Sequence, residues 1–354
     1  MGLAEFCTIG IGGPARHFVT ARTCDDLRHA LGWADSRSLP VFVLGGGSNV
    51  LFPDGEFPGL VIHVALAGLD TLDEPAGGRT LVRAAAGEDW NALVNHCVEN
   101  GLQGVECLAG IPGQVGATPI QNVGAYGQEV AGTILRVHAL DRSTGREVTL
   151  AAADCGFGYR TSRFKARDRN RFIVTAVDYA LAPGTTPCTS YRDISAHLEG
   201  AGVRNPTLQQ VRDAVVEVRR AKAMVCDPGE PSSRSCGSFF TNPIIQADEA
   251  ESVRAAAVEA GVLKPEESMP AFPCADGRVK LSAAWLIQRA GFSRGERRGN
   301  VGLSEKHVLA LVNYGGGTAR EILALAADIR GRVLARFGVL LEPEPVLAGS
   351  TLPS

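Results

Sequence analysis

A run of three glycines offers bare backbone to a ligand. Gly45, Gly46 and Gly47 are followed by Ser48 and Asn49, and the Gly-Lys-Ser/Thr ending of a nucleoside-triphosphate loop does not follow them. Because glycine has no Cβ atom, successive backbone N–H groups can approach an anion closely and bind a pyrophosphate without a lysine. An ordinary strand-to-strand turn explains the same glycines, so both interpretations stay open.

A second segment is rich in glycine and carries no charged residue. Residues 110–127 read GIPGQVGATPIQNVGAYG, with five glycines and two prolines. An irregular, uncharged backbone with many N–H donors suits a buried cofactor that takes hydrogen bonds from the main chain. The alternative is a long ordered loop at the surface.

A third glycine run fits the dinucleotide fingerprint GxGxxG/A only formally. Residues 10–15 read GIGGPA, but no convincing strand precedes them. Residues 17–20 look extended, whereas the fingerprint requires a helix at that point. We therefore interpret this run as a structural turn.

Three polar residues stand in local contexts that restrict their side chains. Arg160 ends a Gly-Tyr-Arg sequence, Ser238 precedes two phenylalanines, and Glu344 lies between two prolines that stiffen the backbone. Each has a simpler alternative, namely a surface arginine, a serine bonded to local backbone and a solvated glutamate. Cys236 lies two residues before Ser238, but no histidine is near it in sequence, which disfavours thiol catalysis.

Hydrophobic periodicity and capping residues predict the elements that would position these groups. In the first half we expect helices at 23–34 and 88–100, strands at 41–44, 60–64, 81–85 and 172–181, and a hairpin within 134–150 that turns at 142–145. In the second half we expect helices at 207–222, 248–260, 281–290 and 318–337, strands at 308–312 and 339–341, and a loop at 227–235. The pattern indicates an α+β protein with a domain boundary between Pro183 and Pro206.

Composition limits the classes of function. The chain has 354 residues, with 42 glycines and 19 prolines, which predicts two or three domains and many tight turns. A formal charge of -3 gives no global field for a nucleic acid or an anionic membrane, so we expect neither as a partner. Nine cysteines, never closer than ten positions, indicate neither a metal site nor a disulfide framework. Without an apolar segment for export or membrane insertion, a cytoplasmic protein is expected.

Five motifs that occur together in order resemble the UDP-N-acetylenolpyruvoylglucosamine reductase family of the first type, also called UDP-N-acetylmuramate dehydrogenases. They are Leu44–Asn49, Ile111–Gly127, Gly158-Tyr159-Arg160, Gly237–Pro243 and Glu342-Pro343-Glu344. The resemblance covers the chain from about Thr8 to Val346.

The resemblance implies both a fold and a chemistry. The fold would be α+β, with a two-part FAD-binding domain of the vanillyl-alcohol-oxidase (PCMH) type at 8–184, subdomains of about 1–66 and 67–205, and a C-terminal substrate-binding domain at 206–346. The chemistry would use noncovalent FAD, with NADPH as co-substrate and a UDP-sugar nucleotide as substrate. The role would be a step in bacterial peptidoglycan precursor synthesis, carried out by a monomer or weak oligomer.

The resemblance also implies roles for single residues. The substrate would be an enol ether conjugated to a carboxylate, so hydride addition at its terminal carbon develops negative charge that needs a cation, hydrogen-bond donors and an acid. Arg160 and Glu344 would stabilise this charge and Ser238 would deliver the proton. The sugar nucleotide would be held by Tyr159, Tyr191, Lys222 and Asn242. The flavin would be held by Gly45, Gly46, Gly47, Ser48, Asn49, Ile111, Pro112, Gly113, Gly116, Ala117, Thr118, Gln121, Asn122, Gly124, Ala125, Tyr126 and Gly127.

Two of the substrate residues have local interpretations as well. Lys222 ends the predicted helix at 207–222, where a positive charge is favourable in itself. Tyr191 is expected in a loop that can close over the ligand.

Two other functions remain as alternatives. One is a different noncovalent-FAD oxidase or dehydrogenase of the same fold that acts on a sugar or hydroxy acid. Residues 45–49 offer no histidine or cysteine for the covalent flavin link that is common among those oxidases. The other is a flavin-binding regulatory protein without catalysis, which the joint presence of Arg160, Ser238 and Glu344 disfavours.

Overall fold

Two compact units make up the chain in the computed structural model, which describes residues 1–73, 77–184 and 186–352. Unit 1 comprises Met1, Ala15–Gly47 and Pro58–Val225. Unit 2 comprises Gly2–Pro14, Ser48–Phe57 and the chain from Cys226 onward. Both units combine helices with sheets, as the predicted α+β class requires.

The helices and strands have the following bounds. The helices are α1 (Cys24–Asp35), α2 (Trp90–Glu99), α3 (Arg192–Gly200), α4 (Leu208–Ala221), α5 (Ala247–Glu259), α6 (Ala283–Arg289) and α7 (Ala319–Phe337). The strands of the first half are β1 (Ala15–Ala21), β2 (Val41–Leu44), β3 (Val50–Leu51), β4 (Phe57–Val64), β5 (Leu69–Leu72), β6 (Thr80–Ala85), β7 (Leu102–Gln103), β8 (Gly124–Ala125), β9 (Gln128–Glu129), β10 (Ile134–Asp141), β11 (Glu147–Ala151) and β12 (Phe172–Pro183). Those of the second half are β13 (Ser235–Ser238), β14 (Ile244–Ile245), β15 (Ala271–Pro273), β16 (Val279–Leu281), β17 (Arg297–Arg298), β18 (Val301–Leu303), β19 (Ala310–Asn313) and β20 (Val346–Leu347).

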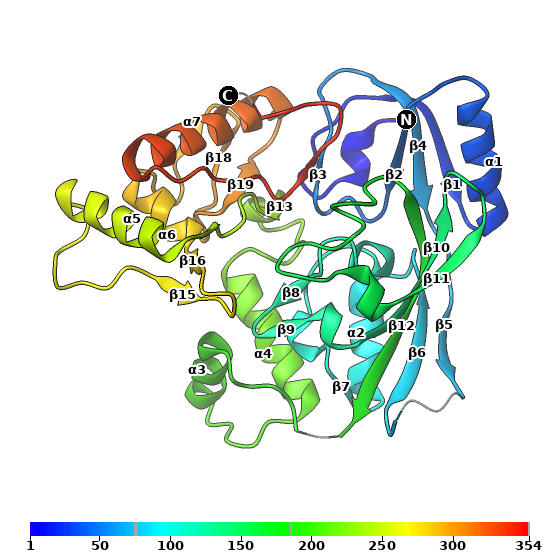
Figure 1. Ribbon diagram of the computed structural model, residues 1–354, viewed down its shortest axis with the longest axis horizontal. Helices are drawn as coiled ribbons and strands as arrows, with labels where there is room; N and C mark the ends of the chain where they lie inside the picture. Colours follow the sequence, from blue (N-terminus) through cyan, green and yellow to red (C-terminus); the bar gives the residue numbers. More distant parts are fainter. Residues whose placement is uncertain (74–76, 185, 353–354) are drawn as a thin grey trace. The chain divides into compact units, whose positions relative to one another are not determined.

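Unit 1 is built on two principal sheets (Figure 1). The smaller has the order β1-β4-β2, with β2 parallel to β4. The larger is antiparallel, with the order β11-β10-β12-β6-β5, and β7 pairs with the end of β12. The strand β1 occupies the position where a dinucleotide fingerprint needs a helix, which confirms that residues 10–15 are not such a site.

Local capping explains where α1 begins. The Asp26 N–H donates to Thr23 Oγ1 at 3.0 Å, and the Asp26 carboxylate accepts from the Thr23 N–H at 2.9 Å. This reciprocal pair satisfies two N–H groups that the first turn of a helix leaves without partners. The same arrangement joins Thr207 and Gln210 at the start of α4, so both predicted helices are confirmed.

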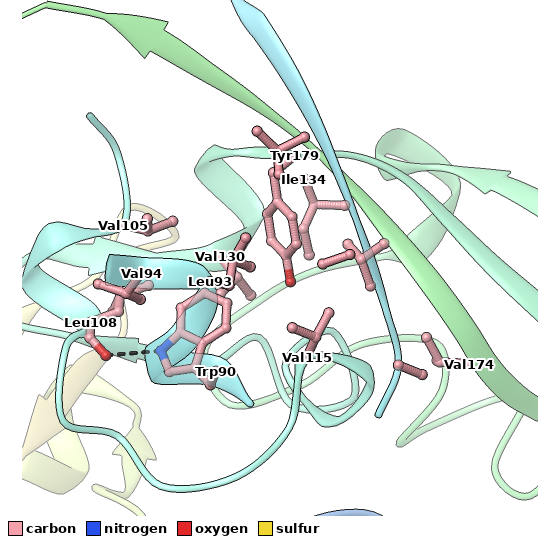
Figure 2. Close-up of a cluster of buried hydrophobic side chains, with 14 of the residues drawn as sticks. Trp90, Leu93, Val94, Val105, Leu108, Val115, Val130, Ile134, Val174 and Tyr179 are labelled. Atoms are coloured by element: carbon pink, nitrogen blue, oxygen red, sulfur yellow. Dashed lines mark hydrogen bonds between the residues drawn. The ribbon is translucent and has the colours of Figure 1, made fainter. Parts of the chain in front are cut away.

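The core of unit 1 holds the glycine-rich segment 110–127 in place. Figure 2 shows Trp90 of α2 and Tyr179 of β12 among buried aliphatic side chains. The Trp90 Nε1–H donates to the Leu108 carbonyl at 2.9 Å, just before the segment begins. Two residues of the segment reach the core. Thr118 Oγ1 lies 2.9 Å from the Tyr179 hydroxyl, and Val115 is fully buried. The segment is therefore anchored to the core at these residues, while most of its other residues are partly exposed.

A buried carboxylate links three strands of the larger sheet. Asp178 on β12 lies between its cross-strand neighbours Arg83 on β6 and Arg136 on β10. It accepts hydrogen bonds from Arg83 Nε at 2.6 Å and Arg136 Nε at 2.8 Å, and His138 Nε2 is 3.1 Å away. Burial alone would raise the pKa of Asp178, but the hydrogen bonds from Arg83 and His138 outweigh it and hold that pKa well below its usual range.

We expect Asp178→Asn to lower the free energy of unfolding by about 2–3 kcal/mol at neutral pH, since it leaves two arginines without their buried partner. The carboxylate stabilises the fold above the pKa of the unfolded chain, about 3.9, and this contribution is lost as pH falls toward the lower folded pKa. Urea unfolding should therefore show the difference from wild type narrowing between pH 5 and pH 3. Asp35→Asn at the exposed end of α1 is the control, and an equal loss in that variant would contradict the assignment.

Unit 2 contains two further sheets and a two-stranded pair (Figure 1). The sheets have the orders β13-β19-β18-β17 and β14-β16-β15, and β20 pairs in parallel with β3. The strand predicted at 339–341 is wrong, because these residues form no ladder and the strand lies at Val346–Leu347. Val339 and Leu341 are buried while Leu340 is half exposed. The alternating apolar pattern of these residues therefore comes from side chains packed into the core, without pairing to another strand.

The units divide later in the chain than the sequence predicts. The predicted boundary lies between Pro183 and Pro206, whereas the contacts assign the continuous stretch Pro58–Val225 to unit 1. The reason is α4, which packs against α2 and α3. Across the described residues, no helix combines the length and the apolar character that crossing a bilayer requires.

Candidate functional site

The two predicted flavin loops lie against each other in unit 1. A Cβ atom added to Gly46 would be 2.8 Å from Gly113 Cα, and one added to Gly45 would be 3.2 Å from Gln114 Oε1. Gly47 has φ of 62°, a conformation that favours glycine. Bare backbone is thus required here by close approach, which supports the ligand-loop interpretation over an ordinary turn.

Several hydrogen-bonding groups lie where these two loops meet. Within the described chain, the amides of Gly45, Gly46 and Gly47 donate no hydrogen bond to the backbone. The buried Gln114 Oε1 also has no hydrogen-bond partner among the described residues. Polar groups that are buried, such as Gln114 Oε1 and those of Gly47, are costly unless water or a ligand satisfies them. Three successive donors fit a pyrophosphate and a lone acceptor fits a flavin N–H or ribityl hydroxyl, so the residues present fit FAD.

The first turn of α2 fixes the start of the glycine-rich segment. The Trp90 N–H donates to the Gly113 carbonyl at 3.0 Å. Asn91 bonds to the segment twice, accepting from the Gly110 N–H at 2.6 Å and donating to the Ile111 carbonyl at 3.1 Å. These bonds hold Gly113 beside the glycine loop.

Asn122 connects the end of this segment to the turn that carries Arg160. Its side-chain amide donates to Glu129 Oε2 at 2.8 Å and to the Gly158 carbonyl at 3.1 Å, and it accepts from the Ala131 N–H at 3.0 Å. Asn122 is buried, and its own φ of 49° lies in the left-handed region. Its side chain is therefore engaged within the protein, and contact with a flavin would use its backbone.

The turn at Arg160 is held in a costly conformation. Arg160 has φ of 52°, and Tyr126 has φ of 48°. Lys165 Nζ donates to the Arg160 carbonyl at 3.2 Å, and Ser162 Oγ donates to the Ile120 carbonyl at 2.6 Å. Left-handed backbone at non-glycine residues costs about 1–3 kcal/mol each and clusters at functional sites. Three such residues, Asn122 included, belong to the predicted site.

Three predicted residues from separate segments form one cluster in unit 1. The rings of Tyr126 and Tyr191 meet edge to face with centroids 5.2 Å apart, and Lys222 Nζ lies 5.6 Å from the centroid of Tyr126. Lys222 also pairs with Asp193, with Nζ 2.5 Å from Oδ2. Sequence reasoning missed Asp193, whose only local signal is a carboxylate in the first turn of α3.

Tyr191 is the last residue of the loop before α3, as predicted. It has extended backbone and is the N-cap residue of that helix. The Tyr191 side chain is 44% exposed. The preceding residue lies near the end of segment 110–127, because a Cβ atom added to Gly127 would be 3.7 Å from Ser190 Oγ.

The other two predicted catalytic residues lie on paired segments of unit 2. The Glu344 N–H donates to the Phe239 carbonyl at 2.9 Å, and the Thr241 N–H donates to the Glu342 carbonyl at 3.1 Å. Ser238 is the last residue of β13, and the next residue in sequence, Phe239, pairs with Glu344. Asn49 Nδ2 donates to the Glu344 carbonyl at 3.3 Å, so the end of the glycine loop contacts this segment.

Contacts of the remaining unit 2 residues refine their roles. Ser238 Oγ lies 3.5 Å from His307 Nε2, a residue that sequence reasoning missed. Asn242 Oδ1 accepts from the Ala283 N–H at the start of α6, which fixes the orientation of the side-chain amide. Cys236 is buried, its thiol donates to the Val50 carbonyl, and burial raises its pKa far above the usual range. A buried neutral thiol is a poor nucleophile, which agrees with the expectation against thiol catalysis.

Comparison with known proteins identifies the family. The FAD binding domain family matches residues 15–151, and the C-terminal domain family of UDP-N-acetylenolpyruvoylglucosamine reductase matches residues 228–348. The enzyme of that name from Thermobifida fusca is 47% identical over 351 residues, covering 99% of this chain and 97% of its own length. The one from Streptomyces coelicolor is 46% identical over 353 residues, covering 99% and 90%.

A solved structure agrees with these relatives. The crystal structure of UDP-N-acetylenolpyruvylglucosamine reductase from Thermus caldophilus is similar with a TM-score of 0.62 and 25% identity, covering 98% of this chain and 97% of that one. The predicted fold class, family and FAD cofactor are confirmed. Since close relatives span nearly the whole chain and both parts match, the chain belongs to the UDP-N-acetylenolpyruvoylglucosamine reductase family and is an FAD-dependent oxidoreductase.

Proposed function

We propose that the chain reduces UDP-N-acetylenolpyruvoylglucosamine to UDP-N-acetylmuramate with NADPH as the electron donor. The reaction would be a step in peptidoglycan precursor synthesis and would take place in the cytoplasm. The observation that carries the proposal is the 47% identity to a reductase of that name over 99% of the chain, a span that includes both matched domains.

The glycine loops would hold FAD noncovalently. When bound, FAD supplies the two-electron chemistry by accepting electrons from NADPH and passing them to the enol ether. The amides of Gly45, Gly46 and Gly47 would bind its pyrophosphate, and Gln114 Oε1 would accept a hydrogen bond from it. Neither segment 45–49 nor segment 110–127 contains a histidine or a cysteine, the residues that commonly form a covalent link to the flavin.

The charge that develops on the substrate carboxylate and adjacent carbon would be met by Arg160 and Glu344. The Arg160 guanidinium stays charged at any physiological pH and can pair with a carboxylate through two parallel hydrogen bonds. Glu344, while carrying a proton, would donate a hydrogen bond. Ser238 Oγ would give its proton to the substrate carbon, which is reasonable for a weak acid held close to a carbanion-like atom.

Steady-state kinetics test this proposal. NADPH and the sugar nucleotide must each present a reacting carbon to the same flavin face, so we expect them to use one pocket in turn. Initial rates of NADPH oxidation should depend on the sugar nucleotide, give parallel double-reciprocal lines and show substrate inhibition. Intersecting lines from a productive ternary complex, or NADPH oxidation that requires only oxygen, would contradict it, the latter favouring an oxidase.

A further inference from the structure

The Lys222 ammonium already has an anionic partner in the ligand-free chain. Lys222 caps the end of α4 and reaches Asp193 in the first turn of α3, with Nζ 2.5 Å from Oδ2. Partial burial lowers the pKa of Lys222, but the hydrogen bond and charge of Asp193 outweigh it, so the pKa is raised. The ammonium is thus held fully charged, next to the rings of Tyr126 and Tyr191.

The ion pair remains open to solvent. The side chains of Lys222 and Asp193 are 38% and 43% exposed. Exposed ion pairs gain little net free energy and exchange readily with other ions. An anion that arrives with more charge than one carboxylate can therefore replace Asp193 on the ammonium.

The net charge of the Lys222–Asp193 pair decides how strongly it attracts a diphosphate. Lys222 and Asp193 together are neutral, so a diphosphate approaching the intact pair meets no net attraction, and a carboxylate left beside it repels it. A lysine binds phosphate as a point charge, so the ammonium can satisfy the carboxylate or the phosphate with the same donors. Asp193 consequently uses the ammonium donors that a phosphate oxygen would use.

We propose that Asp193 is a positioning residue for substrate recognition: its carboxylate holds Lys222 beside Tyr126 in the ligand-free chain and is the group that the diphosphate of the sugar nucleotide displaces. This inference rests on the proposed function, in which Lys222 binds that diphosphate. It also links binding to α3, since the displaced carboxylate and Tyr191 lie in the same turn.

The test is the affinity of the FAD-loaded full chain for UDP and for uridine, measured by isothermal titration calorimetry. Asp193→Asn should bind UDP about three- to tenfold more tightly, as expected for removal of one nearby like charge at a solvated site. Uridine lacks phosphate, so its affinity should not change. Asp193→Glu keeps the charge and should not bind UDP more tightly than wild type.

Two variants separate this role from a structural one. Asp213→Asn on α4 removes the same charge from an exposed residue that pairs with Arg212, and it should leave UDP binding as in wild type. In a Lys222→Ala background, Asp193→Asn should give a smaller gain, because the competition for the ammonium has been removed and only the repulsion between the carboxylate and the phosphates remains. The flavin absorbance of each variant confirms that it is folded and loaded.

The outcomes distinguish the inference from the function on which it rests. Unchanged or weaker UDP binding by Asp193→Asn, an equal gain in Asp213→Asn, or a gain that is undiminished without Lys222 would overturn the inference alone. Failure of the wild-type chain to bind UDP would overturn the proposed function and the inference with it.

Discussion

Ser238→Ala should slow reduction of the enolpyruvyl group by about 10²–10⁴-fold, the usual contribution of general acid catalysis, while flavin reduction by NADPH changes little. The reason is that only the second half-reaction requires a proton at carbon. Ser238 ends β13, and its backbone neighbour Phe239 is held by the Glu344 N–H, so removing the hydroxyl should not disturb the segment. Stopped-flow absorbance of the flavin measures the two half-reactions separately.

Two further variants sharpen the Ser238 experiment. Ser238→Cys should recover part of the activity, because a thiol is a stronger acid of similar reach. Ser252→Ala makes the same chemical change on the exposed face of α5 and should leave both half-reactions as in wild type. Equal slowing of the two half-reactions by Ser238→Ala, or no slowing of the second, would mean that the proton comes from another group.

Gly46→Val should yield folded protein without flavin colour. The Cβ atom that the variant adds would lie 2.8 Å from Gly113 Cα, a distance at which backbone must move. Moving either loop separates the Gly45–Gly47 amides from the Gln114 acceptor, so the groups that fit FAD no longer converge. The ratio of flavin to protein absorbance after purification gives the occupancy.

The control for this loss is a glycine with free space around it. Gly32 in α1 has no atom within 4 Å of an added Cβ, so Gly32→Val should retain flavin. Circular dichroism should show that both variants keep the secondary structure of wild type. Full flavin occupancy in Gly46→Val would show that FAD does not use the junction of the two loops.

Features decided by neighbouring residues could be predicted from the sequence. Thr23 and Thr207 begin helices because each bonds to the residue three positions later, a relation that the sequence shows directly. The glycine loops were recognisable for the same reason, since bare backbone is a local property. The strand expected at 339–341 failed because strands need a partner, and the partner of β20 is β3 near the other end of the chain.

The residues of the site that sequence reasoning missed depend on distant pairings. Asp193 reads locally as a carboxylate that favours a helix start, and only the packing of α3 on α4 brings it to Lys222. His307 is likewise ordinary in sequence until the pairing of β13 with β19 brings its loop to Ser238. The boundary between the units at Val225 also depends on a distant packing contact. Helical periodicity predicts which face of α4 is buried, but it does not predict that α2 and α3 cover that face.

The most direct test of the account is anaerobic reoxidation of the NADPH-reduced enzyme by UDP-N-acetylenolpyruvoylglucosamine. We predict that one equivalent restores the yellow absorbance of the flavin in the absence of oxygen, and that mass spectrometry finds the sugar nucleotide heavier by two hydrogens, as UDP-N-acetylmuramate. Recovery of the colour only on admission of oxygen, with the sugar nucleotide unchanged, would contradict the proposed reaction while leaving FAD binding in place.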